Sequence, residues 1–378
     1  MRRICLLALA CASLLAAQAP TLGAWAPQAS GTRAALRGLS AFSAEVVWAS
    51  GSQGTILRTT DGGAHWMRLA VPGAAALDFR DIQAFSAQLA YALAVGANGG
   101  IYKTTDGGAT WVKQYGNTTR AAGFFLDDLA FWDKDHGLAL GDPLNGHFLL
   151  LRTTDGGQQW QPVTDTPPAL AGEGAFAASG TTLVAGPHGL AWFATGGRSG
   201  ARLFRSPDQG RTWSVADTPL SAPGWSGAGI FSLAFYKNGE FGIAVGGDYT
   251  RPDDRDHAAA VTSDGGATWR LATTPPGGYR SGVAYVPGSQ GRSAIAVGPN
   301  GSDMSRDGGA TWAPLGGEGF NAVAFAAADA GWAAGANGAI AHFLPSAAAQ
   351  EAAERRQLRD AHRRRQAQVD HAIQPQHR

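Results

Sequence analysis

The chain has 378 residues, of which 44% are hydrophobic and only 16% are charged, so its composition is that of a globular protein. Its 30 Lys and Arg residues nearly balance 29 Asp and Glu residues, which gives a formal charge of +1. Because phosphate binding needs a concentrated basic surface, this balance argues against nucleic acid as the main partner. The 53 Gly and 12 Trp residues favour many tight turns with aromatic anchors, and hence an all-β repeat protein.

The chain begins with Met1-Arg2-Arg3 and an apolar run over residues 4–17, which is typical of a signal peptide. The run is too short to cross a bilayer, which takes about 20 helical residues. We therefore expect residues 1–24 to be a signal peptide and the protein to be periplasmic or secreted, with no transmembrane span after signal removal. Both cysteines, Cys5 and Cys11, lie in this segment, so no disulfide, thiol nucleophile or Cys-bound zinc is expected elsewhere. The residues before Cys11 fit a lipoprotein signal poorly, so lipid attachment there is not expected.

An eight-residue motif occurs six times, first at residues 59–66 as Thr-Thr-Asp-Gly-Gly-Ala-His-Trp. The motif is the Asp-box, and successive aspartates are 45, 49, 53, 56 and 43 residues apart, a spacing that fits propeller blades of four short strands. The carboxylate can accept hydrogen bonds from its own turn, the glycines supply positive φ, and the Trp buries a large ring. We assign a structural role rather than metal binding or catalysis to the six aspartates: Asp61, Asp106, Asp155, Asp208, Asp264 and Asp307.

A pattern of two strands precedes each Asp-box and occurs a seventh time, without a box, at residues 331–340. The missing outer strand is found at the other end of the chain, where Trp25-Ala26-Pro27 resembles Trp312-Ala313-Pro314. Trp25 also precedes Trp66 by 41 residues, close to the repeat spacing. We therefore predict an all-β, seven-bladed β-propeller over residues 25–344, in which residues near 24–30 form the outer strand of the last blade. Closing the ring in this way removes exposed sheet edges.

The face opposite the Asp-boxes is the predicted binding surface, because the connections between blades and the turns between second and third strands gather there around the axis. Two of these turns, residues 141–147 and 247–257, are longer than the others, and long loops on a rigid scaffold often carry function. Candidates at the starts of inner strands are Arg80, Asp81, Asp127, Asp128, Glu173, Trp225, Arg280 and Glu318. Candidates in the turns are Asp142, Arg198, Asp248, Tyr249 and Arg251.

No signature of a hydrolase or of a nucleotide-binding enzyme occurs in the sequence. Asp-boxes are also found in sialidases, but the Arg-Ile-Pro segment that usually accompanies that activity is missing, and the propeller region contains only four Glu residues. Hydrolysis of a glycoside by two carboxyl groups stays open as the alternative, because Asp127, Asp128, Glu173 and Glu318 could converge. No catalytic residue, metal or cofactor is otherwise expected.

The last segment, residues 345–378, contains seven Arg and four acidic residues and few large apolar side chains. We expect a polar, Arg-rich tail that is either helical or disordered, since no apolar face would hold a helix to a core. The alternative is an Arg-rich contact for an acidic partner or for lipid headgroups.

The combined pattern resembles the bacterial proteins related to the photosystem II stability/assembly factor, a family of seven-bladed propellers with Asp-boxes. The resemblance covers roughly residues 25–344 and is carried by residues 131–143 leading into 151–157, by Gly246-Gly247-Asp248-Tyr249, and by residues 298–303. It implies a monomeric, non-catalytic, exported module that binds another protein or an envelope complex during assembly. Photosynthetic members have an arginine patch, whereas Arg80, Arg198, Arg251, Arg255 and Arg280 are scattered along this sequence.

Overall fold

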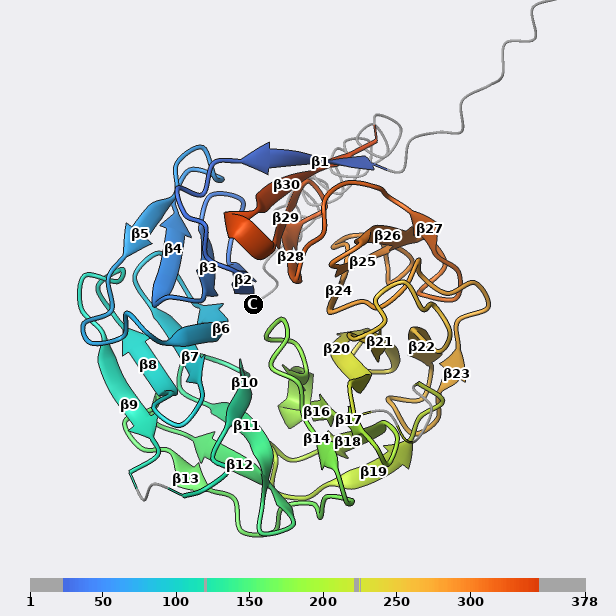
Figure 1. Ribbon diagram of the computed structural model, residues 1–378, viewed down its shortest axis with the longest axis horizontal. Helices are drawn as coiled ribbons and strands as arrows, with labels where there is room; N and C mark the ends of the chain where they lie inside the picture. The colour runs from blue at the N-terminus through green and yellow to red at the C-terminus, as the bar shows by residue number, and fades with distance from the viewer. Residues whose placement is uncertain (1–22, 119–120, 221–223, 225, 347–378) are drawn as a thin grey trace, which may run out of the picture.

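A ring of seven antiparallel sheets surrounds a central axis in the computed structural model, which describes residues 23–118, 121–220, 224 and 226–346 (Figure 1). This arrangement confirms the predicted seven-bladed propeller. The expected signal peptide and Arg-rich tail lie almost entirely outside the described residues, and so does Trp225. No helix in the described ranges is long and apolar enough to span a membrane.

The first four blades follow one another along the chain, and each has four strands. Blade 1 consists of β2 (Leu36–Ala41), β3 (Val47–Gly51), β4 (Thr55–Thr59) and β5 (Met67–Leu69). Blade 2 consists of β6 (Asp78–Ala84), β7 (Ala90–Val95), β8 (Gly100–Thr104) and β9 (Val112–Gly116). Blade 3 consists of β10 (Leu126–Phe131), β11 (Gly137–Leu144), β12 (His147–Thr153) and β13 (Gln161–Pro162). Blade 4 consists of β15 (Leu183–Ala185), β16 (Ala191–Ala194), β18 (Arg202–Ser206) and β19 (Ser214–Asp217), with the short helix η1 (Pro187–Gly189) in its first turn.

The remaining blades include one extended sheet and the joint of the ring. Blade 5 consists of β20 (Ala228–Tyr236), β21 (Phe241–Asp248), β22 (Ala259–Thr262) and β23 (Arg270–Leu271), and two short strands extend its inner edge: β14 (Glu173–Gly174) and β17 (Gly196–Gly197). Blade 6 consists of β24 (Gly282–Tyr285), β25 (Ala294–Gly298), β26 (Gly301–Ser305) and β27 (Ala313–Pro314). Blade 7 consists of β28 (Ala322–Ala327), β29 (Ala330–Ala334), the short helix η2 (Ala336–Gly338), β30 (Ile340–Pro345) and β1 (Gly23–Gln28).

Strand β1 closes the ring, as the sequence predicted. It pairs antiparallel with β30 over six residue pairs, from Gly23 opposite Pro345 to Gln28 opposite Ile340. The strand therefore begins one residue before and ends two residues before the predicted segment 24–30. The indole Nε1 of Trp25 donates a hydrogen bond to Ser302 Oγ of blade 6, at 3.1 Å. The first strand of the chain therefore joins the last blade and contacts the blade before it.

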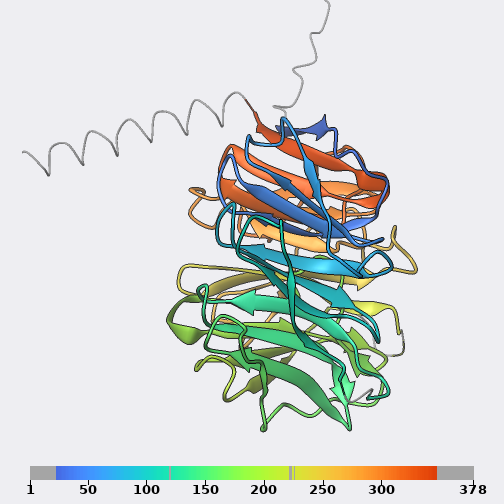
Figure 2. The same cartoon turned by 90° about the vertical axis from the view of Figure 1, so that its left-hand side faces the viewer.

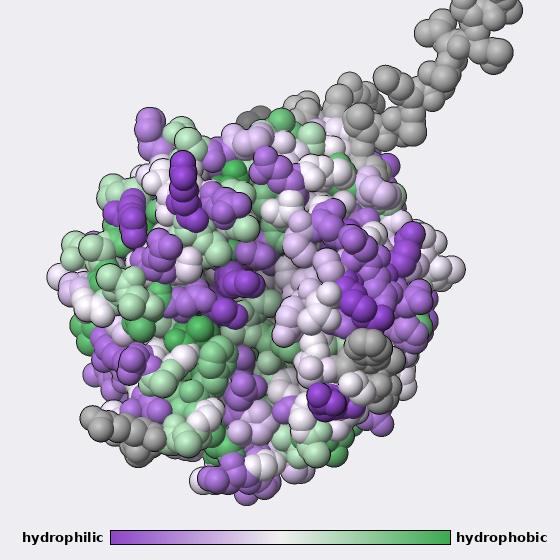
Figure 3. Space-filling model, viewed as in Figure 1, coloured by the Kyte–Doolittle hydropathy of each residue, from purple (hydrophilic) through white to green (hydrophobic). Residues whose placement is uncertain are grey.

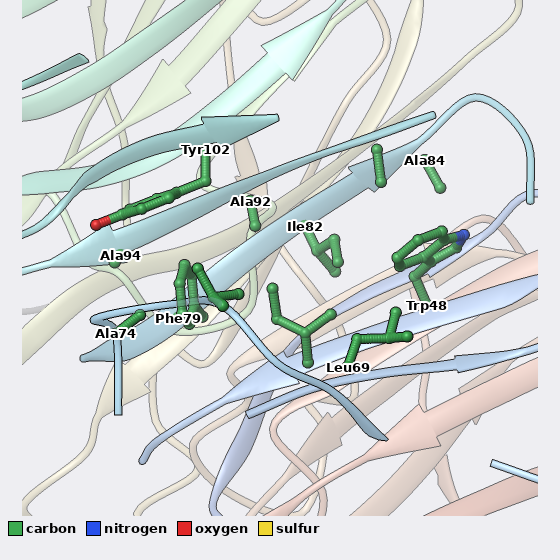
Figure 4. Packing of buried hydrophobic residues seen from close by; sticks show 12 residues of the cluster. Trp48, Leu69, Ala74, Phe79, Ile82, Ala84, Ala92, Ala94 and Tyr102 are labelled. Carbon is green, nitrogen blue, oxygen red and sulfur yellow. The ribbon is translucent and has the colours of Figure 1, made fainter. Parts of the chain in front are cut away.

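The core is divided into apolar layers between neighbouring blades. Figure 4 shows the layer between blades 1 and 2, where Trp48 and Leu69 pack against Phe79 and Ile82. Each of the seven layers also contains one Trp on an outer strand or in the turn before it. Six are the Asp-box tryptophans and the seventh is Trp25: Trp66, Trp111, Trp160, Trp213, Trp269, Trp312 and Trp25. Trp25 thus occupies in blade 7 the place that an Asp-box Trp occupies elsewhere.

The ring has two different faces, which are seen edge-on in Figure 2. The Asp-box face contains the turns between third and fourth strands. The opposite face, here called the B–C face, contains the turns between second and third strands and the connections between blades, and it faces the viewer in Figure 1.

Candidate functional site at the propeller axis

Bulges in the innermost strands direct side chains toward the propeller axis at the B–C face. Pairing shifts register by one residue near the start of β2, β6, β10 and β20. Such a bulge re-aims the extra residue, and bulges are common beside functional sites. The residues at the four shifts are Arg37, Arg80, Asp127 and Phe231.

The two bulged arginines lie close enough for each charge to affect the other. Arg80 Nε donates to Asp78 Oδ2 at 2.8 Å, and Arg80 Nη1 donates to the carbonyl oxygen of Ala177 at 3.1 Å. Arg37 makes no hydrogen bond within the described part of the chain, although it is only partly exposed. Burial lowers the pKa of Arg37, the charge of Arg80 lowers it further, and Asp78 partly offsets both. Arg37 therefore has free donors for an anionic group at the axis.

An aromatic cluster borders the same opening. Phe176 stacks on Phe231 with ring centroids 3.9 Å apart, and Tyr279 and Tyr249 meet Phe231 edge-on at 4.8 and 6.2 Å. Burial raises the pKa of Tyr279, so its hydroxyl stays neutral. Tyr249 is 54% exposed and is a large apolar surface on this face. The opening thus combines free cationic donors with an aromatic wall, and hydrophilic groups gather at the centre of this face in Figure 3.

Asp127 and Asp142 form a pair of acids beside the arginines. Asp127 is 1% exposed, and its Oδ2 has no hydrogen-bond partner among the described residues. Burial raises the pKa of Asp127 well above its usual range, Asp142 raises it further, and Arg80 lowers it. Asp142 Oδ1 accepts a hydrogen bond from Ala175 N at 3.2 Å, while burial raises the pKa of Asp142. Asp142 also lines an open cavity of about 560 Å³ with Leu170 and Phe176.

Asp81 and Asp128 join the inner strands of neighbouring blades. Asp81 Oδ2 accepts from Leu129 N of blade 3 at 2.9 Å, and Asp128 Oδ2 accepts from Leu183 N of blade 4 at 2.8 Å. Both carboxyl groups are buried. Burial raises the pKa of Asp81 to about 6, and burial together with Asp81 raises the pKa of Asp128 well above its usual range. The two carboxyl groups thus act as links between blades and as a coupled acid pair.

Other predicted candidates are held in buried ion pairs. Arg202 Nε donates to Glu173 Oε1 at 2.8 Å, and Thr195 Oγ1 donates to the same oxygen at 2.6 Å. Arg280 Nε donates to Asp303 Oδ2 at 2.7 Å, and both side chains are buried. These carboxylates and guanidinium groups fix loops rather than present free charge.

The remaining candidates lie farther out on the B–C face. Asp248 Oδ2 accepts from Arg251 Nε at 3.1 Å within one turn. Arg198 is exposed, and exposed Glu318 lines a separate open cavity of about 860 Å³ at the ring joint, together with Arg33. The structure therefore brings together Arg80, Asp81, Asp127, Asp128, Asp142 and Tyr249 near the axis. The sequence analysis missed Arg37, Phe176, Phe231 and Tyr279. The available signal was an Arg near the start of two inner strands, Arg37 in β2 and Arg80 in β6.

The Asp-box aspartates have a different environment. In every box the Thr or Ser hydroxyl donates to one carboxylate oxygen of the Asp, for example Thr262 Oγ1 to Asp264 Oδ1 at 2.7 Å, and that oxygen also accepts from Thr268 N at 2.9 Å. Burial acts to raise the pKa of Asp264, but its hydrogen bonds with Thr268 and Thr262 together outweigh burial and lower the pKa to about 2. A box carbonyl also receives donors from the preceding blade, as Gly107 O does from Arg58 Nη1 at 2.8 Å. Within the described ranges, no three His, Cys, Asp or Glu side chains gather as metal ligands would.

The fold is similar to solved propellers of two kinds. It matches YCF48 bound to D1 peptide with a TM-score of 0.62 and 18% identity, over 86% of this chain and 99% of that one. YCF48 from Cyanidioschyzon merolae gives a TM-score of 0.60 and 17% identity, over 85% of this chain and 99% of that one. An ancestral GH74 enzyme also gives a TM-score of 0.60, with 13% identity over 85% of this chain but 47% of the enzyme. At these identities, the resemblance to the assembly-factor family is confirmed at the level of the fold.

Comparison of sequences gives one curated relative. A xyloglucanase from Paenibacillus sp. is 31% identical over 171 residues, which is 42% of this chain. The match spans only 16% of the length of that enzyme. No family model matches the chain.

Proposed function

We propose that this protein is an exported, non-catalytic module that binds a peptide segment of another protein on its B–C face, as an assembly factor does. The observation that carries the proposal is Arg37, a partly buried guanidinium that makes no hydrogen bond in the described chain and lies beside Arg80. Guanidinium groups bind carboxylates through two parallel hydrogen bonds, and this geometry gives both strength and orientation. The aromatic cluster would then hold an apolar side chain of the same segment.

Solved structures with a similar fold also support a peptide-binding function. YCF48, whose whole length this fold matches, has been solved with a D1 peptide. Peptide binding at the axis also explains why Arg37 of blade 1 lies at the same opening as Phe231 and Tyr249 of blade 5. The partner proposed is a protein segment that carries a carboxylate next to an apolar or aromatic side chain.

A photocrosslinking amino acid at position 249 tests this function in living cells. We expect Tyr249, which is 54% exposed beside Phe231, to give an adduct with one identified protein. Val112, 63% exposed on outer strand β9, is the matched control position and should give no such adduct. A peptide of the crosslinked sequence should bind the purified chain, and Arg37→Gln should weaken it about tenfold or more, whereas Arg306→Gln on the Asp-box face should not. Equal adducts at both positions, or unchanged binding by Arg37→Gln, would contradict the proposal.

Glycoside hydrolysis is the second candidate, favoured by the xyloglucanase match. It needs two carboxyl groups on either side of the scissile bond, one of them holding a proton at working pH. Asp127 and Asp142 are the pair whose charges interact beside a cavity, but Asp127 is 1% exposed. Release of reducing sugar from xyloglucan, lost in Asp142→Asn, would establish this candidate and overturn the non-catalytic proposal.

A further inference from the structure

The open cavity of about 560 Å³ on the B–C face adjoins the aromatic cluster at the axis. Its lining comes mostly from the connection between blades 3 and 4, together with the β11–β12 turn and strand β17. Phe176 belongs to both features, because it lines the cavity and stacks on Phe231 with ring centroids 3.9 Å apart. A segment that is bound at the axis can therefore place a neighbouring side chain in this cavity.

One wall of the cavity is apolar and is held in place by hydrogen bonds. Leu170 is 47% exposed, yet its backbone N donates to Glu173 Oε2 at 2.8 Å. Arg202 Nη2 of blade 4 donates to the carbonyl oxygen of Pro168 at 3.0 Å and so fixes the same loop from the other side. Leu170 and Phe176 thus offer an apolar surface to the aliphatic part of a long side chain.

The polar side of the cavity contains one acid with an unused oxygen. Asp142 Oδ1 accepts from Ala175 N at 3.2 Å, while Oδ2 makes no hydrogen bond with the described residues and is not among the buried atoms. Gly174 leaves the carboxyl group uncovered, because a Cβ there would lie 2.8 Å from Asp142 Oδ1. Glu173, the other acid of the lining, is paired with Arg202. No Lys or Arg in the described ranges pairs with Asp142, so its charge is the one left unbalanced in the cavity.

A second, buried carboxyl group lies beside Asp142. Asp127 is the extra residue of the β10 bulge and follows Leu126, which pairs with Gly141. Asp127 is 1% exposed, and its Oδ2 has no hydrogen-bond partner among the described residues. Arg80, whose charge acts on Asp127, donates its hydrogen bonds to other groups. A positive charge bound at Asp142 would therefore be attracted by Asp127 as well.

The acceptors at the cavity indicate which kind of cation fits. A guanidinium binds best through two parallel hydrogen bonds, whereas the ammonium of lysine is a compact charge on a flexible four-carbon stem. Asp142 has only one unused oxygen, and Leu170 and Phe176 line the same cavity, where they can contact a stem. A divalent metal ion would need more ligands, and no three His, Cys, Asp or Glu side chains of the described chain gather here.

We propose that this cavity, here called the lysine pocket, takes a lysine side chain of the partner segment, with its ammonium on Asp142 Oδ2 and its stem against Leu170 and Phe176. The inference rests on the proposed function, since it adds a basic side chain to the carboxylate and the apolar side chain of the same segment. It assigns to the partner a feature by which the propeller can select one sequence among many that carry a carboxylate.

A small probe tests the lysine pocket without any partner. N-acetyl-lysine-N-methylamide at millimolar concentration should shift the NMR signals of the labelled Leu170 methyl groups in the full chain. The signals of Leu271, 37% exposed on strand β23, should not move. The uncharged analogue N-acetyl-norleucine-N-methylamide should bind about fivefold more weakly or worse. Asp142→Asn should weaken the lysine probe as much, whereas Asp217→Asn on the exposed strand β19 should not.

Three results would overturn the lysine pocket. They are equal affinity for the two probes, an unchanged response to the lysine probe in Asp142→Asn, and no shift of Leu170 with either probe. The amide oxygen of Asp142→Asn can still accept from Ala175 N. If this variant nevertheless does not fold, the comparison of the two probes on the unsubstituted chain still decides.

The peptide crosslinked at position 249 separates this proposal from the proposed function. It should contain a lysine whose replacement by glutamine weakens binding about fivefold or more in the unsubstituted chain and much less in Asp142→Asn. If the peptide binds but no lysine in it matters, the lysine pocket fails and the proposed function stands. If no peptide binds while the lysine probe behaves as expected, the proposed function fails and the cavity stands as a site for a lysine side chain.

Discussion

The two faces of this propeller use the same side chain, aspartate, in opposite ways. On the Asp-box face, hydrogen bonds from the box turn lower the pKa of the carboxyl groups, as at Asp106 and Asp264. At the axis of the B–C face, burial raises the pKa values of Asp81, Asp127 and Asp142. Satisfied, ionised carboxylates are structural, whereas a cluster of acids with raised pKa values beside free arginine donors is typical of a functional site. The contrast shows that the surroundings, rather than the residue type, distinguish structure from function here.

Opening the ring should have the largest effect, because closure supports both faces. Trp25→Ala removes the large ring that β1 contributes to the layer between blades 6 and 7. We expect a loss of about 3 kcal/mol in the free energy of unfolding, measured by urea denaturation. Trp25→Phe should retain most of the stability. If Trp25→Ala is as stable as the unsubstituted chain, strand β1 does not close the ring in solution.

Breaking one Asp-box should have the next largest effect and should be destabilising at neutral pH. Thr262 is buried, and its hydroxyl accepts from Gly266 N at 3.0 Å and donates to Asp264 at 2.7 Å. Thr262→Val leaves Gly266 N without its acceptor and removes one of the hydrogen bonds to Asp264 Oδ1, and we expect a cost of about 1–3 kcal/mol in urea denaturation. Thr262→Ser is the matched control, since Ser206 and Ser305 hold the same place in two other boxes. Equal losses in the Val and Ser variants would mean that the hydroxyl is unimportant.

Removing one acid at the axis should raise the free energy of unfolding, whereas the two preceding substitutions lower it. Asp81→Asn keeps an oxygen that can accept from Leu129 N, and its amide can donate to Asp128. Because the buried charge is removed, we expect the free energy of unfolding at about pH 8 to rise by about 1 kcal/mol. Asp81→Ala loses the acceptor and should destabilise the protein. A loss of stability at pH 8 in Asp81→Asn would show that ionised Asp81 is needed for the fold.

The pH profile of stability is the finest test of the difference between the faces. Groups whose pKa is raised in the folded state, such as Asp81, stabilise the protein fully below the unfolded pKa of about 4. This stabilisation is lost as the pH rises through about 6. Groups whose pKa is lowered in the folded state, such as Asp264, stabilise the protein fully above about pH 4. This stabilisation is lost as the pH falls through about 2. We therefore expect the urea midpoint to be highest near pH 4–5. In Asp81→Asn, the midpoint should fall less as the pH rises above this range. A maximum at pH 8 that this variant leaves unchanged would contradict the assignment.

Prediction from the sequence succeeded where the chain repeats a local pattern. Each box forms its own turn from residues within four positions of one another, so spacing alone indicated the blades. Trp25 was predictable as part of the last blade because Trp25-Ala26-Pro27 resembles Trp312-Ala313-Pro314. The bulges at Arg37 and Arg80 were not predictable, since the register of one strand against the next is set by pairing rather than by either strand alone.

The candidate site depended on contacts between distant segments. Glu173 and Arg280 were predicted as candidates for surface contacts, but both are buried, and their partners Arg202 and Asp303 lie 29 and 23 residues away. The hydrogen bond between Arg80 and the carbonyl oxygen of Ala177 joins residues 97 positions apart, and no periodicity in the sequence indicates it.

The sequence by itself determined the repeat, the number of blades and the strand that closes the ring, because turn chemistry and large aromatic anchors act over a few residues. Only the tertiary structure decided which acids are buried, which arginine has free donors and which connection between blades contacts Arg80. The proton affinity of an acid and the availability of an arginine donor both depend on burial and on neighbouring charges. At this axis, the groups that supply the burial and the charges come from four blades that are distant in the sequence.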